Sequence, residues 1–193
     1  RLIQCGEQLD HPREALITTY ATSTWQTATL HAAERVARGE DGAIVALASR
    51  LGADGYPTEV HNADDRVLKS PLQYLETHDE SRFIYRFGVT APQYAGGSLF
   101  AEGDRDNWYR LQPYLIGLLL AKGIPLLWQG QELCESAQMA GEGLARIAFL
   151  RPVHWERFYD HPGRGTIWLV RRLLRVRAEH SHLRDGEFFF FDD

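Results

Sequence analysis

Polar residues of the types that catalyse reactions follow three of the apolar runs in this sequence. The three groups are Gly6-Glu7, Thr77-His78-Asp79 and Gln129-Gly130-Gln131-Glu132. Two carboxylates and a histidine are the parts needed for acid–base work on a sugar. In parallel α/β folds, groups at the carboxyl ends of the strands meet on one rim, and that rim carries the site. Spacing alone leaves another interpretation open, because a carboxylate at a strand end also caps helices and forms loop salt bridges.

The elements that must position these groups alternate along the chain. Short apolar runs predict strands at residues 1–7, 15–20, 72–75 and 124–128. Amphipathic spacing predicts helices at residues 25–38, 43–51, 108–122 and 166–179, the third of them capped by Asn107. Loops are expected at residues 52–69, 86–103 and 129–165. Because strands alternate with helices, the sequence predicts an α/β fold with a parallel sheet and helical crossovers.

Composition excludes several classes of protein. The chain has 193 residues, of which 44% are hydrophobic and 24% charged, so collagen-like and largely disordered structures are excluded. The net charge of −5 gives no general attraction to nucleic acid or to an anionic membrane. The longest apolar run is far shorter than the roughly 20 residues that span a bilayer. Two distant cysteines, Cys5 and Cys134, favour buried thiols and a reducing compartment, and hence the cytoplasm.

Three segments resemble the α-amylase family of glycoside hydrolases. Residues 74–79 (YLETHD) resemble its strand-7 motif, in which an aromatic and two further residues precede Asn-His-Asp. Residues 3–7 (IQCGE) resemble its strand-5 motif, and residues 123–132 (GIPLLWQGQE) are similar to its strand-8 segment. The order and separation of the three segments also fit. The resemblance implies a fold of class α/β: the C-terminal half, strands 5–8 with their helices, of a TIM (β/α)8 barrel over residues 1–185. Residues 186–193 would begin a following β-domain.

The resemblance also implies roles for single residues. Glu7 would be the general acid, which requires a raised pKa of the kind that partial burial supplies. Asp79 would hold two hydroxyls of the sugar at the cleavage point and stabilise the transition state, and His78 would bind the same sugar. Arg82 and Trp128 are further substrate-binding candidates, Arg82 by positioning the rim and Trp128 by stacking on a ring. The alternatives for these two are a surface arginine and a barrel-core tryptophan.

Two departures from the family pattern limit what the resemblance implies. Thr77 stands where the family usually has Asn, which removes two amide donors and puts fine substrate detail in doubt. The family's nucleophile, an Asp at the end of strand 4, has no counterpart in these segments. The odd ends of the sequence indicate a fragment, and the chain alone is predicted to be inactive. Three aromatic residues near the predicted strand-7 loop are weaker candidates for lining a glycan cleft: Tyr85, Tyr94 and Trp108.

The sequence therefore predicts part of a retaining hydrolase or transglycosylase that acts on α-glucans or oligosaccharides such as starch or glycogen. No cofactor or metal is expected in the chemistry, although the parent protein could hold structural calcium. Expected partners are the glucan and the N-terminal half of the same barrel, because open strand edges otherwise pair with a second copy or aggregate. Two other hypotheses remain: a non-catalytic amylase-like scaffold or glycan-binding protein, and an unrelated α/β domain whose carboxylates only cap helices.

Overall fold

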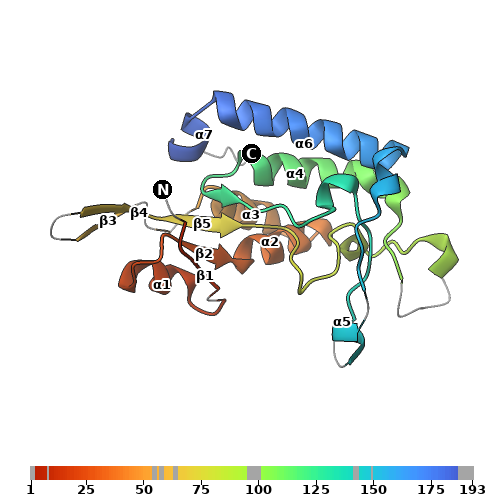
Figure 1. Ribbon diagram of the computed structural model, residues 1–193, viewed down its shortest axis with the longest axis horizontal. Helices are drawn as coiled ribbons and strands as arrows, with labels where there is room; N and C mark the ends of the chain where they lie inside the picture. The colour runs from red at the N-terminus through yellow and green to blue at the C-terminus, as the bar shows by residue number, and fades with distance from the viewer. Residues whose placement is uncertain are drawn as a thin grey trace. The chain divides into compact units, whose positions relative to one another are not determined.

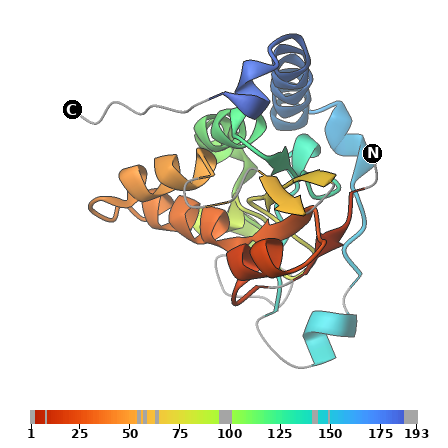
Figure 2. The same ribbon diagram turned by 90° about the vertical axis from the view of Figure 1, so that its left-hand side faces the viewer.

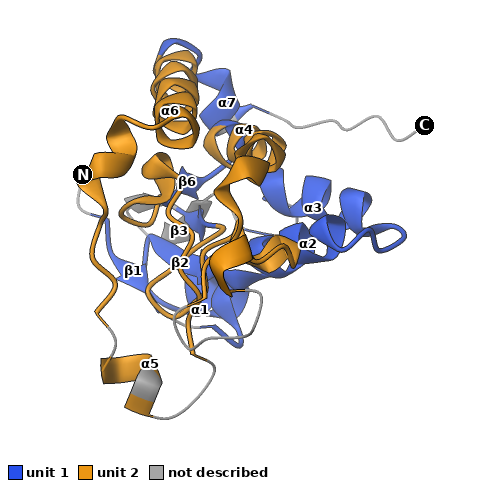
Figure 3. Ribbon diagram, turned by 90° about the vertical axis from the view of Figure 1, so that its right-hand side faces the viewer, with its two compact units in different colours: residues 1–74, 120–126, 179–193 blue, residues 75–119, 127–178 orange. Residues whose placement is uncertain are grey.

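The computed structural model describes residues 3–7, 9–53, 56, 59–62, 65–94, 101–140, 144–148 and 150–186. The chain divides into two compact units (Figure 3). Unit 1 comprises Arg1–Tyr74, Leu120–Leu126 and Glu179–Asp193, and unit 2 comprises Leu75–Leu119 and Leu127–Ala178. Apart from Gly186, the expected start of a β-domain at residues 186–193 lies outside the described residues. The boundary between residues 185 and 186 therefore stays a prediction.

A four-stranded parallel sheet forms the centre of unit 1 (Figure 1). In their order across the sheet, the strands are β1 (Cys5–Gly6), β2 (Ser23–Gln26), β5 (Ser70–Gln73) and β6 (Ile124–Pro125). The longest pairing joins β2 and β5 over four residues, from Ser23 opposite Ser70 to Gln26 opposite Gln73. The prediction of an α/β fold with four parallel strands is confirmed.

The helices of unit 1 include two that the sequence predicts well. The remaining elements of this unit are α1 (Pro12–Thr18), α2 (Thr27–Ala37), α3 (Ala43–Leu51), α7 (His182–Asp185) and the hairpin of β3 (Glu59–Asn62) and β4 (Asp65–Leu68). Helices α2 and α3 lie side by side (Figure 2). Helix α3 has the predicted bounds, and α2 lies within the predicted range. Gly39, at φ 73°, follows the end of α2 in the left-handed conformation typical of a glycine there.

The strand expected at residues 15–20 is wrong, because this segment belongs to helix α1. Pro12 occupies the first turn, where its fixed φ suits a helix, and the buried Leu16 anchors the inner face. The hydroxyl of Thr18 donates to the carbonyl of Glu14 at 2.9 Å, so a residue with high strand propensity is satisfied within the helix. The strand that the sheet requires is β2, which begins at Ser23, three residues after the predicted range ends.

The other three predicted strands also differ in their bounds, and β1 covers only Cys5–Gly6 of the predicted range 1–7. Strand β5 ends at Gln73, two residues before the predicted end, and β6 covers two residues instead of five. The hairpin β3–β4 lies in a stretch that was expected to be a loop, so that expectation is also wrong. These errors move the ends of the strands but leave their order unchanged.

Unit 2 consists of helices and short 3-10 turns. Its elements are η1 (Tyr85–Phe87), η2 (Pro92–Tyr94), η3 (Arg105–Leu111), α4 (Gln112–Leu120), η4 (Gln131–Leu133), α5 (Leu144–Ala148), η5 (Trp155–Phe158) and α6 (His161–Glu179). Helices α4 and α6 lie side by side (Figure 1), and Arg177 of α6 donates to the carbonyl of Leu119 at 3.2 Å. None of the described helices is both long enough and apolar enough to cross a membrane.

The beginnings of both long helical segments in unit 2 differ from prediction. Asp104, rather than Asn107, caps the first one, and its side chain accepts the N–H of Asp106 at 3.0 Å. The segment then starts as the 3-10 helix η3 before α4 continues it. Helix α6 begins five residues earlier than expected, because Asp160 Oδ1 accepts the N–H of Gly163 at 2.8 Å. A Cβ at Gly163 would lie 1.8 Å from the carbonyl oxygen of Arg157, so only glycine fits this turn.

Candidate functional site

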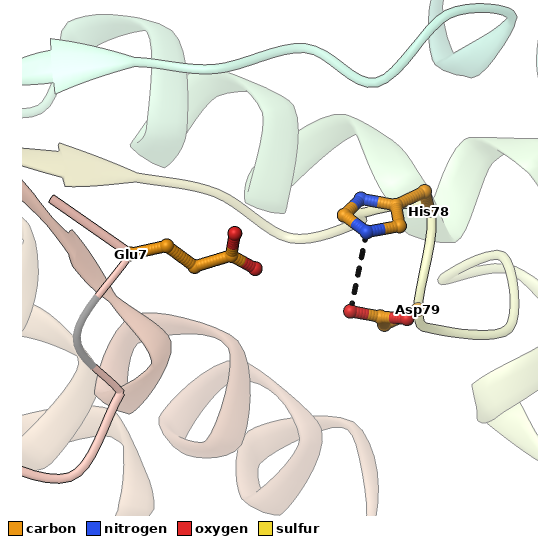
Figure 4. Close-up of side chains that lie close together, drawn as sticks. All are labelled: Glu7, His78 and Asp79. Atoms are coloured by element: carbon orange, nitrogen blue, oxygen red, sulfur yellow. Dashed lines mark ion pairs between the residues drawn. The ribbon is translucent and has the colours of Figure 1, made fainter. Parts of the chain in front are cut away.

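Glu7 belongs to unit 1 and directly follows strand β1. Figure 4 draws its side chain, which is exposed. The sequence predicts a glutamate at a strand end, and this local placement is observed. The partial burial expected for a general acid is not observed for Glu7 among the described residues. The assignment of Glu7 as general acid therefore stays a prediction.

His78 and Asp79 belong to unit 2 and contact each other. His78 Nε2 lies 3.3 Å from Asp79 Oδ2 (Figure 4), and the two side chains are 49% and 45% exposed. The half-exposed pair can therefore offer hydrogen-bonding groups to a ligand.

Thr77 stabilises a local turn at the position where the family motif has Asn. Its side chain is buried, and its hydroxyl accepts the N–H of Asp79 at 3.2 Å. Its carbonyl accepts the N–H of Glu80 at 3.3 Å. This is the local turn that Ser and Thr hydroxyls form with a residue two positions on. Thr77 thus fixes the backbone that presents His78 and Asp79.

Glu76 and Arg82 form a buried ion pair behind this turn. Arg82 Nη1 lies 2.9 Å from Glu76 Oε2, and the N–H of Phe83 donates to Glu76 Oε1 at 2.9 Å. The two side chains are 2% and 6% exposed. Burial raises the pKa of the Glu76 carboxyl, although the charge of Arg82 opposes this effect. Glu76 lies within the recognised motif, although the motif predicts no role for it.

Arg82 connects two segments of unit 2, and it is not the surface arginine that was the alternative. Its Nη2 donates to the carbonyl of Gln129 at 2.7 Å, and its backbone N–H donates to Ala137. Gly130 lies beside it at φ 86°, and a Cβ there would come 2.5 Å from Cγ of Glu135. The substrate-binding role of Arg82 stays a prediction, while the contacts that it makes hold the polypeptide around the site in place.

Trp128 lies next to His78. The two ring centroids are 5.8 Å apart and the planes are tilted by 49°. The backbone N–H of Trp128 donates to the side-chain oxygen of the buried Gln131 at 3.2 Å. Trp128 is half-buried. It is therefore neither fully buried in a core nor fully exposed, and stacking on a sugar stays a prediction.

Two arginines that the sequence analysis missed hold the His78–Asp79 pair. Arg146 Nη2 donates to both the carbonyl and Oδ1 of Asp79, at 2.9 and 3.1 Å. Arg151 Nη2 donates to the carbonyl of His78 at 2.7 Å. Both lie about 70 residues beyond Asp79 in a stretch expected to be a loop, and no local motif marks them. Only the tertiary fold brings them to this site.

A second charged network surrounds Glu135, which is 2% exposed. Arg157 Nη1 donates to Glu135 Oε2 at 2.7 Å, and its Nη2 donates to Glu102 at 2.7 Å. His154 Nδ1 lies 3.0 Å from Glu135 Oε2. The ring of His154 is therefore oriented by a carboxylate, in the way that positioned histidines usually are.

Cys134 is unsuited to nucleophilic chemistry. Burial raises the pKa of its thiol to about 12, so the reactive thiolate is scarce at neutral pH. Its backbone carbonyl instead accepts a hydrogen bond from Arg105 Nε at 2.9 Å. The expectation of a buried thiol is confirmed for Cys134, whereas Cys5 is exposed, so that expectation is wrong for Cys5.

Comparisons with known proteins connect this fold with the α-amylase family. No family model matches the chain. The pullulanase of Bacillus subtilis is 24% identical over 113 residues, which is 58% of this chain and 14% of the pullulanase. Over most of its length the chain is similar in sequence or structure to α-amylase-family enzymes. This confirms the resemblance drawn from the three sequence segments.

Two solved structures share the fold. The cyclic α-maltosyl-(1→6)-maltose hydrolase of Arthrobacter globiformis superimposes with a TM-score of 0.60 at 21% identity, over 95% of this chain and 35% of that one. The maltogenic α-amylase AmyB of Thermotoga neapolitana gives a TM-score of 0.53 at 16% identity, over 92% and 33%. The chain thus spans about a third of the solved structures that it resembles.

Proposed function

We propose that this chain forms the C-terminal half of a (β/α)8 catalytic barrel in a retaining enzyme that acts on α-glucosidic bonds. The observation that carries the proposal is the order of polar groups after the strands of one parallel sheet. Glu7 follows β1, residues 77–79 follow β5, and residues 129–132 follow β6. The chain superimposes on about a third of each of two amylase-family structures. This likeness supports the proposal that its four strands are half of an eight-stranded barrel.

In the proposed reaction, Glu7 donates a proton to the glycosidic oxygen as the bond from C1 to that oxygen breaks. A carboxylate nucleophile forms the glycosyl-enzyme, and water or another sugar then attacks C1 while Glu7 takes back a proton. We propose that the nucleophile comes from outside this sequence. Asp79 and His78 bind the sugar ring, and their half-exposed side chains are available for that. Bound sugar and the remaining strands would supply the burial that Glu7 needs.

The rest of the barrel is the proposed partner of this chain. In the sheet of unit 1, β1 and β6 are the outermost strands among the described residues. Parallel strands with open edges pair readily with other strands. We propose an α-glucan or oligosaccharide as substrate because of the same likeness to amylases. The loops would determine whether water or a sugar is the acceptor.

The test replaces Glu7 by Gln in the natural full-length protein and measures hydrolysis of maltotriose and of α-glucosyl fluoride. Loss of general acid catalysis should lower the rate on maltotriose by about 10²–10⁴. Fluoride departs without a proton, so the formation of the glycosyl-enzyme from this substrate should suffer far less. Glu14→Gln, at an exposed acid in the first turn of α1, is the matched control and should leave both rates unchanged.

Two results would count against the proposal. An unchanged rate of Glu7→Gln on maltotriose would remove Glu7 from the acid role. A wild-type protein that binds maltotriose but hydrolyses and transfers nothing would favour the alternative of a glycan-binding scaffold.

A further inference from the structure

A pocket in unit 2 lies beside the residues that hold His78 and Asp79. Its volume is about 170 Å³, and three arginines line it together with His154 and Tyr94. The arginines are Arg82, Arg146 and Arg151. Ligand pockets for whole small molecules usually have roughly 300–1,000 Å³, so this pocket fits one compact group rather than a sugar chain.

The three arginines that line the pocket differ in their hydrogen-bond partners. Arg82 pairs with Glu76, and Arg146 pairs with Asp79 at 3.1 Å. Arg151 donates instead to a neutral acceptor, the carbonyl of His78. Burial and the charges of Arg82 and Arg146 lower the pKa of Arg151, and the charge of Asp79 opposes them only in part.

The carboxylates that also line the pocket are already held. Glu135 and Glu102 both accept hydrogen bonds from Arg157, each at 2.7 Å. Glu135 in addition orients His154, whose ring nitrogen lies 3.0 Å away. The pocket therefore combines a cation with a neutral partner, two neighbouring cations and an oriented imidazole. Guanidinium groups arranged in this way suit a compact anion with several acceptor oxygens.

We propose that this pocket binds the phosphate group of a phosphorylated sugar. The proposal rests on the proposed function, because it names a substrate class for the same site. The same two arginines connect the pocket with the sugar-binding pair: Arg146 contacts Asp79, and Arg151 contacts His78. A phosphate held by them would lie next to the ring that His78 and Asp79 hold. Binding the phosphate would also compete with Asp79 for Arg146 and so leave the Asp79 carboxylate for the sugar hydroxyls.

The test is isothermal titration of the natural full-length protein with glucose 6-phosphate, inorganic phosphate and glucose. Glucose 6-phosphate should bind at least about tenfold more tightly than glucose, and more tightly than inorganic phosphate. Arg151→Gln should weaken the binding of glucose 6-phosphate by about tenfold or more, because a charge-assisted hydrogen bond is lost. Arg171→Gln, at an exposed arginine of α6, is the matched control and should bind as wild type does.

Each contrary result overturns a defined part of the proposal. Equal affinity for glucose 6-phosphate and inorganic phosphate would overturn the proposal that the phosphate is part of a sugar phosphate. Equal binding by the Arg151→Gln and Arg171→Gln variants, or no binding of either phosphate, would overturn the pocket itself. If Arg151→Gln does not fold, Arg151→Lys keeps the charge without the fork and should give a smaller but measurable loss.

Hydrolysis assays on maltotriose separate this inference from the proposed function. A protein that hydrolyses maltotriose but binds no phosphate would refute only the pocket. A protein that binds glucose 6-phosphate through Arg151 but breaks no α-glucosidic bond, phosphorylated or neutral, would refute the proposed function.

Discussion

The two units bury polar groups in different ways. In unit 1, Gln73 donates to the carbonyls of Leu51 and Lys122 and accepts the hydroxyl of Thr29 at 3.0 Å. The buried Lys69 of the same unit donates to two carbonyls, at 2.6 and 2.8 Å. In unit 2, two buried arginines instead meet carboxylates: Arg82 pairs with Glu76, and Arg157 pairs with Glu135.

The two units bury polar groups differently because they contain different kinds of backbone structure. Unit 1 joins strands and helices whose backbones already form regular hydrogen bonds. A few side-chain hydrogen bonds to neutral acceptors therefore suffice to tie strand β5 to the neighbouring turns. Unit 2 holds irregular segments, and Arg82 alone connects Glu76 with the carbonyl of Gln129. A guanidinium with five donors can satisfy several acceptors from different segments at once. Buried charge in unit 2 therefore takes over part of the role that regular secondary structure has in unit 1.

Disrupting the charged network of unit 2 should reduce stability the most. Arg157→Leu leaves Glu135 and Glu102 without the cation that they share, and Glu135 is 2% exposed. Removing one partner of a buried pair typically costs about 3–5 kcal/mol. We expect the free energy of unfolding, from urea denaturation of the full-length protein, to fall by about that amount.

An exposed pair in unit 1 serves as the control, because its nitrogen–oxygen distance is the same. Arg35 Nε lies 2.7 Å from Glu40 Oε2, the distance that separates Arg157 from Glu135, but these side chains are 49% and 41% exposed. Arg35→Leu should cost about 0–1 kcal/mol. Equal costs for the two substitutions would mean that burial does not distinguish the pairs, and the contrast between the units would fail.

An intermediate effect is expected for the neutral network of unit 1. Gln73→Leu removes donors to two carbonyls and leaves the hydroxyl of Thr29, which is buried, without its acceptor. Such a loss typically costs about 1–3 kcal/mol. The same urea measurement should place Gln73→Leu between Arg35→Leu and Arg157→Leu. A cost above that of Arg157→Leu would reverse the proposed roles of neutral and charged groups.

Sequence patterns predict unit 1 better than unit 2 for a related reason. Periodic apolar residues mark α2 and α3 because their local spacing decides which face is buried. The error at α1 arose where the apparent strand propensity of Ile17 and Thr18 was overridden by Pro12 and the buried Leu16. In unit 2, by contrast, the starts of η3 and α6 depend on single capping carboxylates, which a pattern of apolar residues does not reveal.

Prediction of the candidate site from sequence is limited in the same way. The motif around His78 and Asp79 is visible in the sequence because its residues are adjacent. Arg146 and Arg151 contact this pair from about 70 residues away, and an arginine in a loop has no spacing that distinguishes it from a surface charge. Thr77 departs from the family motif, and only the structure shows that its hydroxyl accepts the N–H of Asp79.

A smaller, pH-dependent effect on stability is expected for the carboxylate of Glu102 in unit 2. Burial alone would raise the pKa of Glu102, but the hydrogen bond from Ser136 and the charge of Arg157 lower it below the ordinary value of 4.5. A carboxylate with a lowered pKa in the folded state stabilises the protein above the unfolded pKa, and this stability is lost as pH falls through the folded value.

Glu102→Gln should therefore be less stable than wild type near pH 6, by less than Gln73→Leu is. The gap should close as pH falls below 4.5, in urea midpoints measured across this range. Glu40→Gln, in the exposed pair of unit 1, serves as control. If the gap for Glu102→Gln stayed constant on acidification, its stabilising contribution would not depend on charge.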